Sequence, residues 1–126
     1  MPRGRLRARG KEPIMKKIEA IIRPAKLEEL KDELLAAGLK GMTVAQVKGC
    51  GKQHGWKEYY RGSEVIVNMV PKVMVSMVVE DDRVDAMVEA VCRVARTGDV
   101  GDGKIFVMPV EEAIRIRTGE RGAAAV

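Results

Sequence analysis

With 126 residues and a mass of 13.9 kDa, the chain has the length of one domain with one hydrophobic core. Hydrophobic residues make up 46% and charged residues 33%, which excludes a disordered, collagen-like or disulfide-built chain. The net charge is +5, but residues 1–14 hold five basic residues against one acidic residue, so the rest of the chain lacks the basic excess of a nucleic-acid-binding domain.

The Arg- and Gly-rich residues 1–14 are predicted to be a disordered leader. No apolar stretch follows them, so they are not a secretory signal. No apolar run in the chain reaches the roughly 18 residues of a membrane span. Cys50 and Cys92 fit no metal or redox spacing, which favours a reducing compartment. We therefore expect a cytoplasmic protein.

The first elements alternate between strand and helix patterns. Residues 17–23 carry hydrophobic side chains at every second position and precede Pro24, which predicts a strand. Residues 26–37 place Leu at three- and four-residue spacing before Gly38, which predicts a helix that ends at this glycine. Residues 42–48 are rich in β-branched residues and predict a second strand.

Between about Gly49 and Met69 no period persists, and glycines, charges and aromatic residues alternate irregularly. A loop of this length in a small domain is uncommon and usually functional.

The second half repeats the pattern. Residues 71–80 carry hydrophobic side chains at every second position from Val73 to Val79, which predicts a strand. After it, Asp81 or Asp82 is expected to cap a helix that ends at Gly98. Residues 105–107 predict a fourth strand and residues 114–118 a short fifth, followed by a flexible tail at 121–126.

The order of these elements is that of an α+β, ferredoxin-like βαββαβ sandwich with one long loop and a short extra C-terminal strand. Two helices would cover one face of the sheet. The other face lacks the regular polar side of a solvated sheet, so we expect it to pack against further copies of the chain.

Residues 97–104 (Thr-Gly-Asp-Val-Gly-Asp-Gly-Lys) lie between a helix and a strand. Glycines let backbone amides point together at an anion, and Lys104 supplies charge. A plain turn explains the same glycines, with Gly98 as the helix terminator.

Arg115 and Arg117 are two residues apart and would project from the same face of a strand. Paired guanidinium groups suit phosphate oxygens, and an anion would offset their repulsion with Lys104. The alternative is a solvated edge whose charges prevent aggregation.

Catalytic constellations are scarce. His54 is the only histidine, so one chain cannot form a His-based metal cluster, and a Ser/His/Asp arrangement would rest on the long loop.

Four segments resemble the PII nitrogen-regulatory signal-transduction proteins, and the resemblance covers residues 15–120. They are 15–24 (Met-Lys-Lys-Ile-Glu-Ala-Ile-Ile-Arg-Pro), 60–64 (Tyr-Arg-Gly-Ser-Glu), 97–107 (Thr-Gly-Asp-Val-Gly-Asp-Gly-Lys-Ile-Phe-Val) and 114–119 (Ile-Arg-Ile-Arg-Thr-Gly).

The resemblance implies a homotrimeric signal-transduction regulator without catalytic residues. ATP or ADP would bind between neighbouring subunits, with 2-oxoglutarate beside MgATP. The long loop at about 50–68, called the T-loop in the family, would dock onto an ammonium transporter or nitrogen-assimilation enzymes. Contact with a membrane would be indirect, through the transporter, and no direct contact with nucleic acid is expected.

The resemblance also assigns site residues. The phosphates would be held by Gly101, Gly103, Lys104, Arg115 and Arg117, and Asp102 would also belong to the nucleotide-binding residues. The neighbouring subunit would contribute Ile21, Thr43, Gly51, Lys52 and Gln53. Lys72 and Gln53 would meet 2-oxoglutarate, and Gln53 would also meet the Mg²⁺ of ATP. The target-binding loop residues would be Trp56, Tyr59, Tyr60, Arg61 and Ser63, and Ser63 is also a candidate for modification.

The chain departs from the family pattern at several positions. Val65 stands where the best-known modification tyrosine follows the loop signature, which excludes uridylylation or adenylylation at that position. Ser76 replaces a glutamate common in relatives, and Cys50 and Ala25 replace bulkier residues, so the ligand sites are expected to be shaped differently.

Two other functions fit parts of the sequence. A slow ATPase would use the same cleft, but Gln53 is the only evident residue for orienting water. A nucleic-acid-binding module would use the Arg-rich leader.

Overall fold

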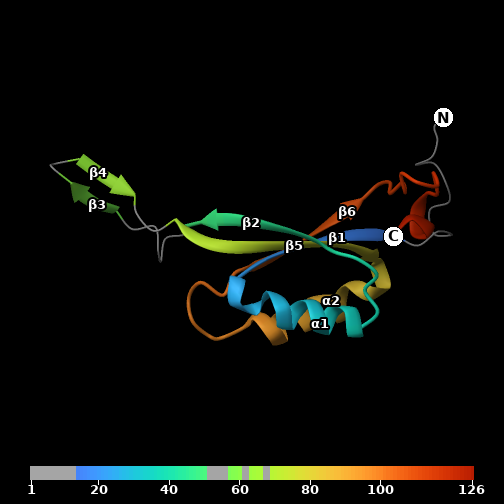
Figure 1. Cartoon of the computed structure of the whole chain (residues 1–126), viewed down its shortest axis with the longest axis horizontal. Helices are drawn as coiled ribbons and strands as arrows, with labels where there is room; N and C mark the ends of the chain where they lie inside the picture. The colour runs from blue at the N-terminus through green and yellow to red at the C-terminus, as the bar shows by residue number, and fades with distance from the viewer. Residues whose placement is uncertain (1–13, 51–56, 61–62, 67–68) are drawn as a thin grey trace.

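The computed structural model describes residues 14–50, 57–60, 63–66 and 69–126. Within these ranges, four strands form an antiparallel sheet in the order β2-β5-β1-β6, and two α-helices pack on one face of it (Figure 1). The elements of this layered unit are β1 (Met15–Ile22), α1 (Leu27–Ala36), β2 (Thr43–Gly49), β5 (Val70–Glu80), α2 (Val84–Ala95) and β6 (Lys104–Val110). The predicted α+β, ferredoxin-like fold is confirmed.

The core lies between the helices and the sheet. Every second side chain of β1 and β5 faces the helices, and the antiparallel register pairs Ile18 with Met77 and Ala20 with Val75. The largest side chains that are less than 2% exposed are Ile18, Ile22, Leu30, Leu34, Met87, Val75 and Val91. The hydrophobic side chains at every second strand position therefore pack against those spaced three and four residues apart on the helices, and together they form one apolar layer.

The expected end of α1 is confirmed. Gly38 has φ +99°, its N–H donates to Leu35 O at 3.0 Å, and Leu39 N–H donates to Leu34 O at 3.0 Å. These two bonds form a Schellman motif, for which glycine is the preferred residue because the left-handed backbone carries no penalty there.

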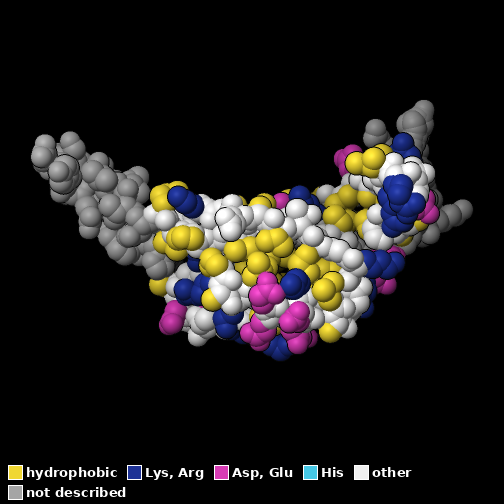
Figure 2. Space-filling model, in the orientation of Figure 1, with side chains coloured by type: hydrophobic (Ala, Val, Ile, Leu, Met, Phe, Trp, Pro, Cys, Tyr) yellow, Lys and Arg dark blue, Asp and Glu magenta, His cyan; other side chains and the backbone are white. Residues whose placement is uncertain are grey.

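The opposite face of the sheet is partly apolar. Phe106 is 47% exposed and lies opposite Glu19 in the β1–β6 register, and partly buried Met74, Val78 and Met108 share this face. Lys17 and Glu19 form an ion pair at 3.1 Å among them. Figure 2 shows the molecule from the side, with acidic side chains over the helices and hydrophobic side chains above them.

The long loop contains two strands that we did not predict. β3 (Lys57–Tyr60) and β4 (Ser63–Ile66) pair with each other in a separate two-stranded sheet (Figure 1). Tyr59-Tyr60 and Val65-Ile66 are strong strand formers on either side of Arg61-Gly62, which is the sequence pattern of a two-residue hairpin connection. The hairpin was not predicted because its strands are too short to set up a hydrophobic period along the loop.

The prediction of a fifth strand over residues 114–118 is wrong. Ile114 forms only an isolated bridge to Arg121, and Gly119 N–H donates to Arg115 O at 2.7 Å. The chain reverses at this turn, where Gly119 has φ +77°. The tail beyond it contains a 3-10 helix, Gly122–Ala125.

Both predicted boundaries of the second helix also differ. A 3-10 helix at Asp81–Arg83 precedes α2, whose N-cap residue Arg83 makes no side-chain capping bond, and Asp81 instead pairs with Lys16 at 3.3 Å. α2 ends at Ala95, so Gly98 is part of the following loop and not the helix terminator. Among the described residues, no helix is long and apolar enough to cross a membrane.

Candidate anion-binding site

A loop of residues 97–103, here called the anion loop, joins α2 to β6 and is held by one carboxylate. Asp102 Oδ2 accepts hydrogen bonds from Thr97 N–H at 2.8 Å and Gly98 N–H at 2.9 Å, and Oδ1 accepts one from Thr97 Oγ1 at 2.5 Å. These bonds lower the pKa of Asp102 well below its ordinary value of 3.8, because they stabilise the charged carboxylate. The ends of the anion loop are thereby tied together.

Two cations anchor the anion loop to the sheet. Arg23, which follows β1, places Nε 3.3 Å from Asp102 Oδ1 and donates from Nη2 to Val100 O at 2.7 Å. Lys72 of β5 donates from Nζ to Gly101 O. Burial lowers the pKa of Lys72, and the positive charge of Arg23 lowers it further.

Gly103 lies directly against the backbone of β1. It has φ +110°, and a Cβ on it would lie 1.7 Å from Ile21 O. Ile21 pairs with Lys104 in the β1–β6 register. Ile21 therefore lies beside Gly103 and Lys104 of its own chain, whereas the resemblance assigns it to the neighbouring subunit.

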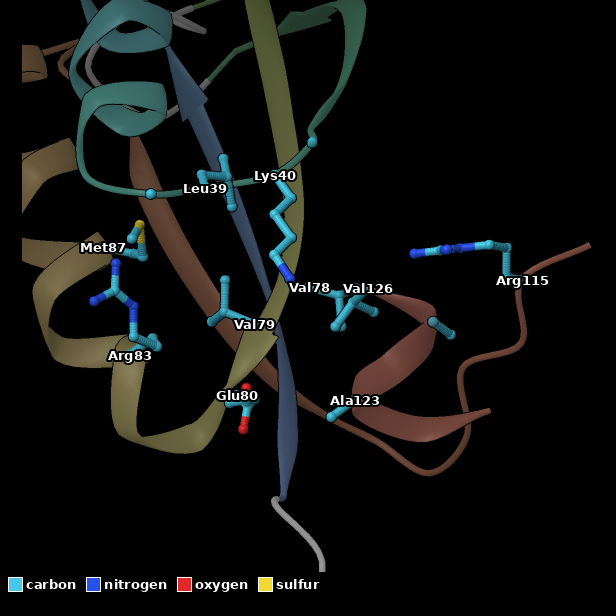
Figure 3. Close-up of a pocket in the computed structure, with 13 residues that line it drawn as sticks. Leu39, Lys40, Val78, Val79, Glu80, Arg83, Met87, Arg115, Ala123 and Val126 are labelled. Carbon is cyan, nitrogen blue, oxygen red and sulfur yellow. The ribbon is translucent and has the colours of Figure 1, made fainter. Parts of the chain in front are cut away.

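A separate cavity holds the predicted arginine Arg115. It has a volume of about 470 Å³ and lies between the α1–β2 connection, the end of β5 and the C-terminal segment. Figure 3 shows Arg115 and Lys40 reaching toward it from different elements, with Val78 and Val126 between them. Arg115 also pairs with Glu120 at 3.1 Å.

One chain does not bring the predicted phosphate ligands together. Lys72 of β5 contacts the anion loop, whereas Val78 of β5 lines the cavity of Arg115, and six strand residues span about 20 Å. Arg117 lies exposed in the turn after Arg115, and Thr43 begins β2 two residues after Gly41 of this cavity. Within one chain Lys104 therefore lies apart from Arg115, and the convergence of Lys104 with Arg115 and Arg117 between subunits stays a prediction.

Several expected site residues cannot be placed. Gly51, Lys52, Gln53, Trp56 and Arg61 lie outside the described residues. The backbones of Tyr59, Tyr60 and Ser63 belong to the β3–β4 hairpin. In the described part of the chain, no group of three or more His, Cys, Asp or Glu could hold a metal ion.

Sequence reasoning missed Arg23. Its position before Pro24 marks a strand end, and no period or motif links it to a loop more than seventy residues away.

Because the folded protein lowers the pKa of Asp102, its contribution to stability is present above pH 3.8 and is lost as the pH falls below that value. We expect Asp102→Asn to remove this part of the acid dependence, so that the unfolding temperatures of variant and wild type converge as the pH falls. Thermal unfolding between pH 7 and pH 2 measures it, because the contribution is lost progressively from pH 3.8 toward the lower pKa of the folded state. A difference that stays constant across this range would contradict the assigned role of the charge.

The chain is similar to known proteins in both sequence and fold. Residues 15–120 match the family model of the nitrogen regulatory protein P-II. Nitrogen regulatory proteins P-II from Cereibacter sphaeroides and Azospirillum brasilense are 56% and 54% identical over 112 residues, which is 89% of this chain and 100% of each relative. The crystal structure of Arabidopsis thaliana PII bound to citrate matches with a TM-score of 0.73 and 38% identity, and the match covers 90% of this chain and 94% of that one.

The ferredoxin-like fold and the family match together define the class of the protein, a signalling regulator. The chain belongs to the nitrogen regulatory protein P-II family.

Proposed function

We propose that this chain senses ATP or ADP together with 2-oxoglutarate and passes their binding state to target proteins through the T-loop. The observation that carries the proposal is the anion loop, whose glycine-rich backbone is held in a defined shape beside Lys72 and Lys104. Shaped backbone with adjacent cations is a general solution for binding phosphate.

The nucleotide site would lie between copies in a homotrimer. One copy supplies the anion loop, Ile21 and Lys104, and the next supplies Arg115, Arg117 and Thr43. This arrangement accounts for the separation of the two cation sets within a chain, and the partly apolar open face of the sheet supplies surface for association. Gly51, Lys52 and Gln53 would complete the site.

The second effector would bind next to the nucleotide. Lys72 offers an ammonium group to one carboxylate of 2-oxoglutarate, and Gln53 would contact both this ligand and the Mg²⁺ of ATP. Support for a carboxylate ligand comes from the relative from Arabidopsis thaliana, whose structure is bound to citrate.

Signalling would follow from linkage between ligands and T-loop conformations. Different effector states would favour different conformations of residues 50–68, and each target would accept one of them. The targets would be an ammonium transporter or nitrogen-assimilation enzymes in the cytoplasm, with Trp56, Tyr59, Tyr60, Arg61 and Ser63 at the contact. The chain would act without catalysis, and turnover of MgATP at about 1 s⁻¹ or faster would contradict this part of the proposal.

Calorimetric titration of the full chain with MgATP, with and without 2-oxoglutarate, tests the function. We expect 2-oxoglutarate to tighten ATP binding, and Arg115→Ala to weaken ATP binding roughly ten- to hundredfold, because charged hydrogen bonds to phosphate are lost. Arg93→Ala is the matched control, because Arg93 pairs with Glu33 on the helical layer. Equal ATP affinity in the Arg115 and Arg93 variants, or a monomer in light scattering, would contradict the proposed site.

A further inference from the structure

The anion loop contains a negative charge, that of Asp102, next to Gly101 and Gly103. A carboxylate repels phosphate, so Asp102 needs an explanation if this loop binds a nucleotide. Its two oxygens accept bonds from Thr97 and Gly98, and Arg23 lies beside Oδ1. The carboxylate is thus directed toward its own loop and the sheet.

We propose that Asp102, with Arg23 as its partner, is a positioning residue that holds the anion loop in its phosphate-binding shape and does not itself contact the nucleotide. The inference rests on the proposed function, and it replaces the direct contact that the family resemblance assigns to Asp102.

Apart from the bond from Lys72 to Gly101 and the contact of Gly103 with β1, the anion loop has little else to hold it. Residues 97–100 are exposed, and Val100, the only large hydrophobic residue of the loop, is 57% exposed, so apolar burial contributes little. Gly98 and Gly101 adopt φ +95° and +96°, conformations that leave the loop many alternatives once its bonds are lost. The hydrogen bonds that Asp102 accepts therefore determine where the backbone N–H groups of the anion loop point.

Arg23 also holds the anion loop in its shape, although it lies outside the loop. Its guanidinium reaches both the Asp102 carboxylate and the Val100 carbonyl, so one rigid side chain joins two points of the loop to the end of β1. It also offsets the negative charge of Asp102. An arriving anion then meets a neutral pair beside Lys72 and Lys104.

A charge-matched pair of variants separates positioning from simple repulsion. Asp99 lies in the same loop, and its side chain makes no hydrogen bond or ion pair to another described residue. Asp99→Asn removes one negative charge and should leave ATP binding unchanged or tighter. Asp102→Asn removes the same charge, yet it should weaken ATP binding roughly ten- to hundredfold.

Amide hydrogen exchange without nucleotide gives the second readout. In Asp102→Asn, we expect faster exchange at Thr97 and Gly98 and unchanged exchange in β1 and β5. Arg23→Met should weaken ATP binding, Arg23→Lys should restore part of it, and Arg23→Met combined with Asp102→Asn should bind about as weakly as Asp102→Asn alone.

The outcomes are distinct. Asp102→Asn binding ATP as tightly as Asp99→Asn, or additive losses in the double variant, would overturn the positioning role. A wild-type chain that binds no ATP would instead contradict the proposed function. Unchanged amide exchange at Thr97 and Gly98 in Asp102→Asn would show that Asp102 does not hold the loop in its shape.

Discussion

Gly103→Ala is expected to destabilise the folded chain by about 3 kcal/mol or more, from left-handed backbone strain and overpacking together. The new Cβ would lie 1.7 Å from Ile21 O and 2.9 Å from Ile21 C. Both atoms belong to the backbone of a central strand, which cannot move aside without breaking its pairing with β5. Urea unfolding of the two proteins measures the loss, and the distorted loop should also abolish ATP binding.

Gly98→Ala is the matched control. Gly98 has a similar φ of +95° in the same loop, but a Cβ there would meet no atom within 4 Å. Only the backbone strain remains, which costs about 1 kcal/mol. Equal losses in the two variants would show that contact with Ile21 is not the cause.

Lys104→Ala and Arg115→Ala chains are expected to bind ATP poorly when each is alone and to recover binding when they assemble together. Lys104 and Arg115 lie at opposite ends of the sheet in one chain, so a site between copies takes one residue from each. An interface formed by intact Lys104 of one chain and intact Arg115 of the next is complete.

The recovery has a defined size. In a closed trimer that contains both variants, one interface in three combines both intact residues, so roughly a third of the wild-type number of ATP sites should return. Co-expression with two affinity tags isolates the mixed oligomers, and calorimetry gives the number of ATP sites per chain. Mixed oligomers that bind no more ATP than the separate variants would show that Lys104 of one copy and Arg115 of the next do not share a site.

Sequence patterns predicted the fold because its core elements depend on local periods. The hydrophobic residues at every second position over 71–80 and the leucine spacing over 26–37 each specify a buried face without reference to the rest of the chain. The hairpin β3–β4 was missed because four-residue strands are too short to establish a period. Residues 114–118 alternate like a strand, but Gly119 turns the chain there.

The candidate site was only partly predictable. The glycines and Lys104 stand together in one segment, so the motif identified the anion loop. Three features depend on long-range packing and have no local signal: the anchoring by Arg23, the contact of Gly103 with Ile21, and the distance between Lys104 and Arg115.

The ammonium group of Lys72 has three donors and gives one of them to the Gly101 carbonyl of the anion loop. A carboxylate drawn to Lys72 would compete with that carbonyl or share the ammonium group with it, and the strength of one contact would alter the other. Thermodynamic reciprocity then requires that whatever the first ligand does to the affinity of the second, the second does equally to the first. Under the proposed function, Lys72 would thus couple the binding of the nucleotide to the binding of 2-oxoglutarate.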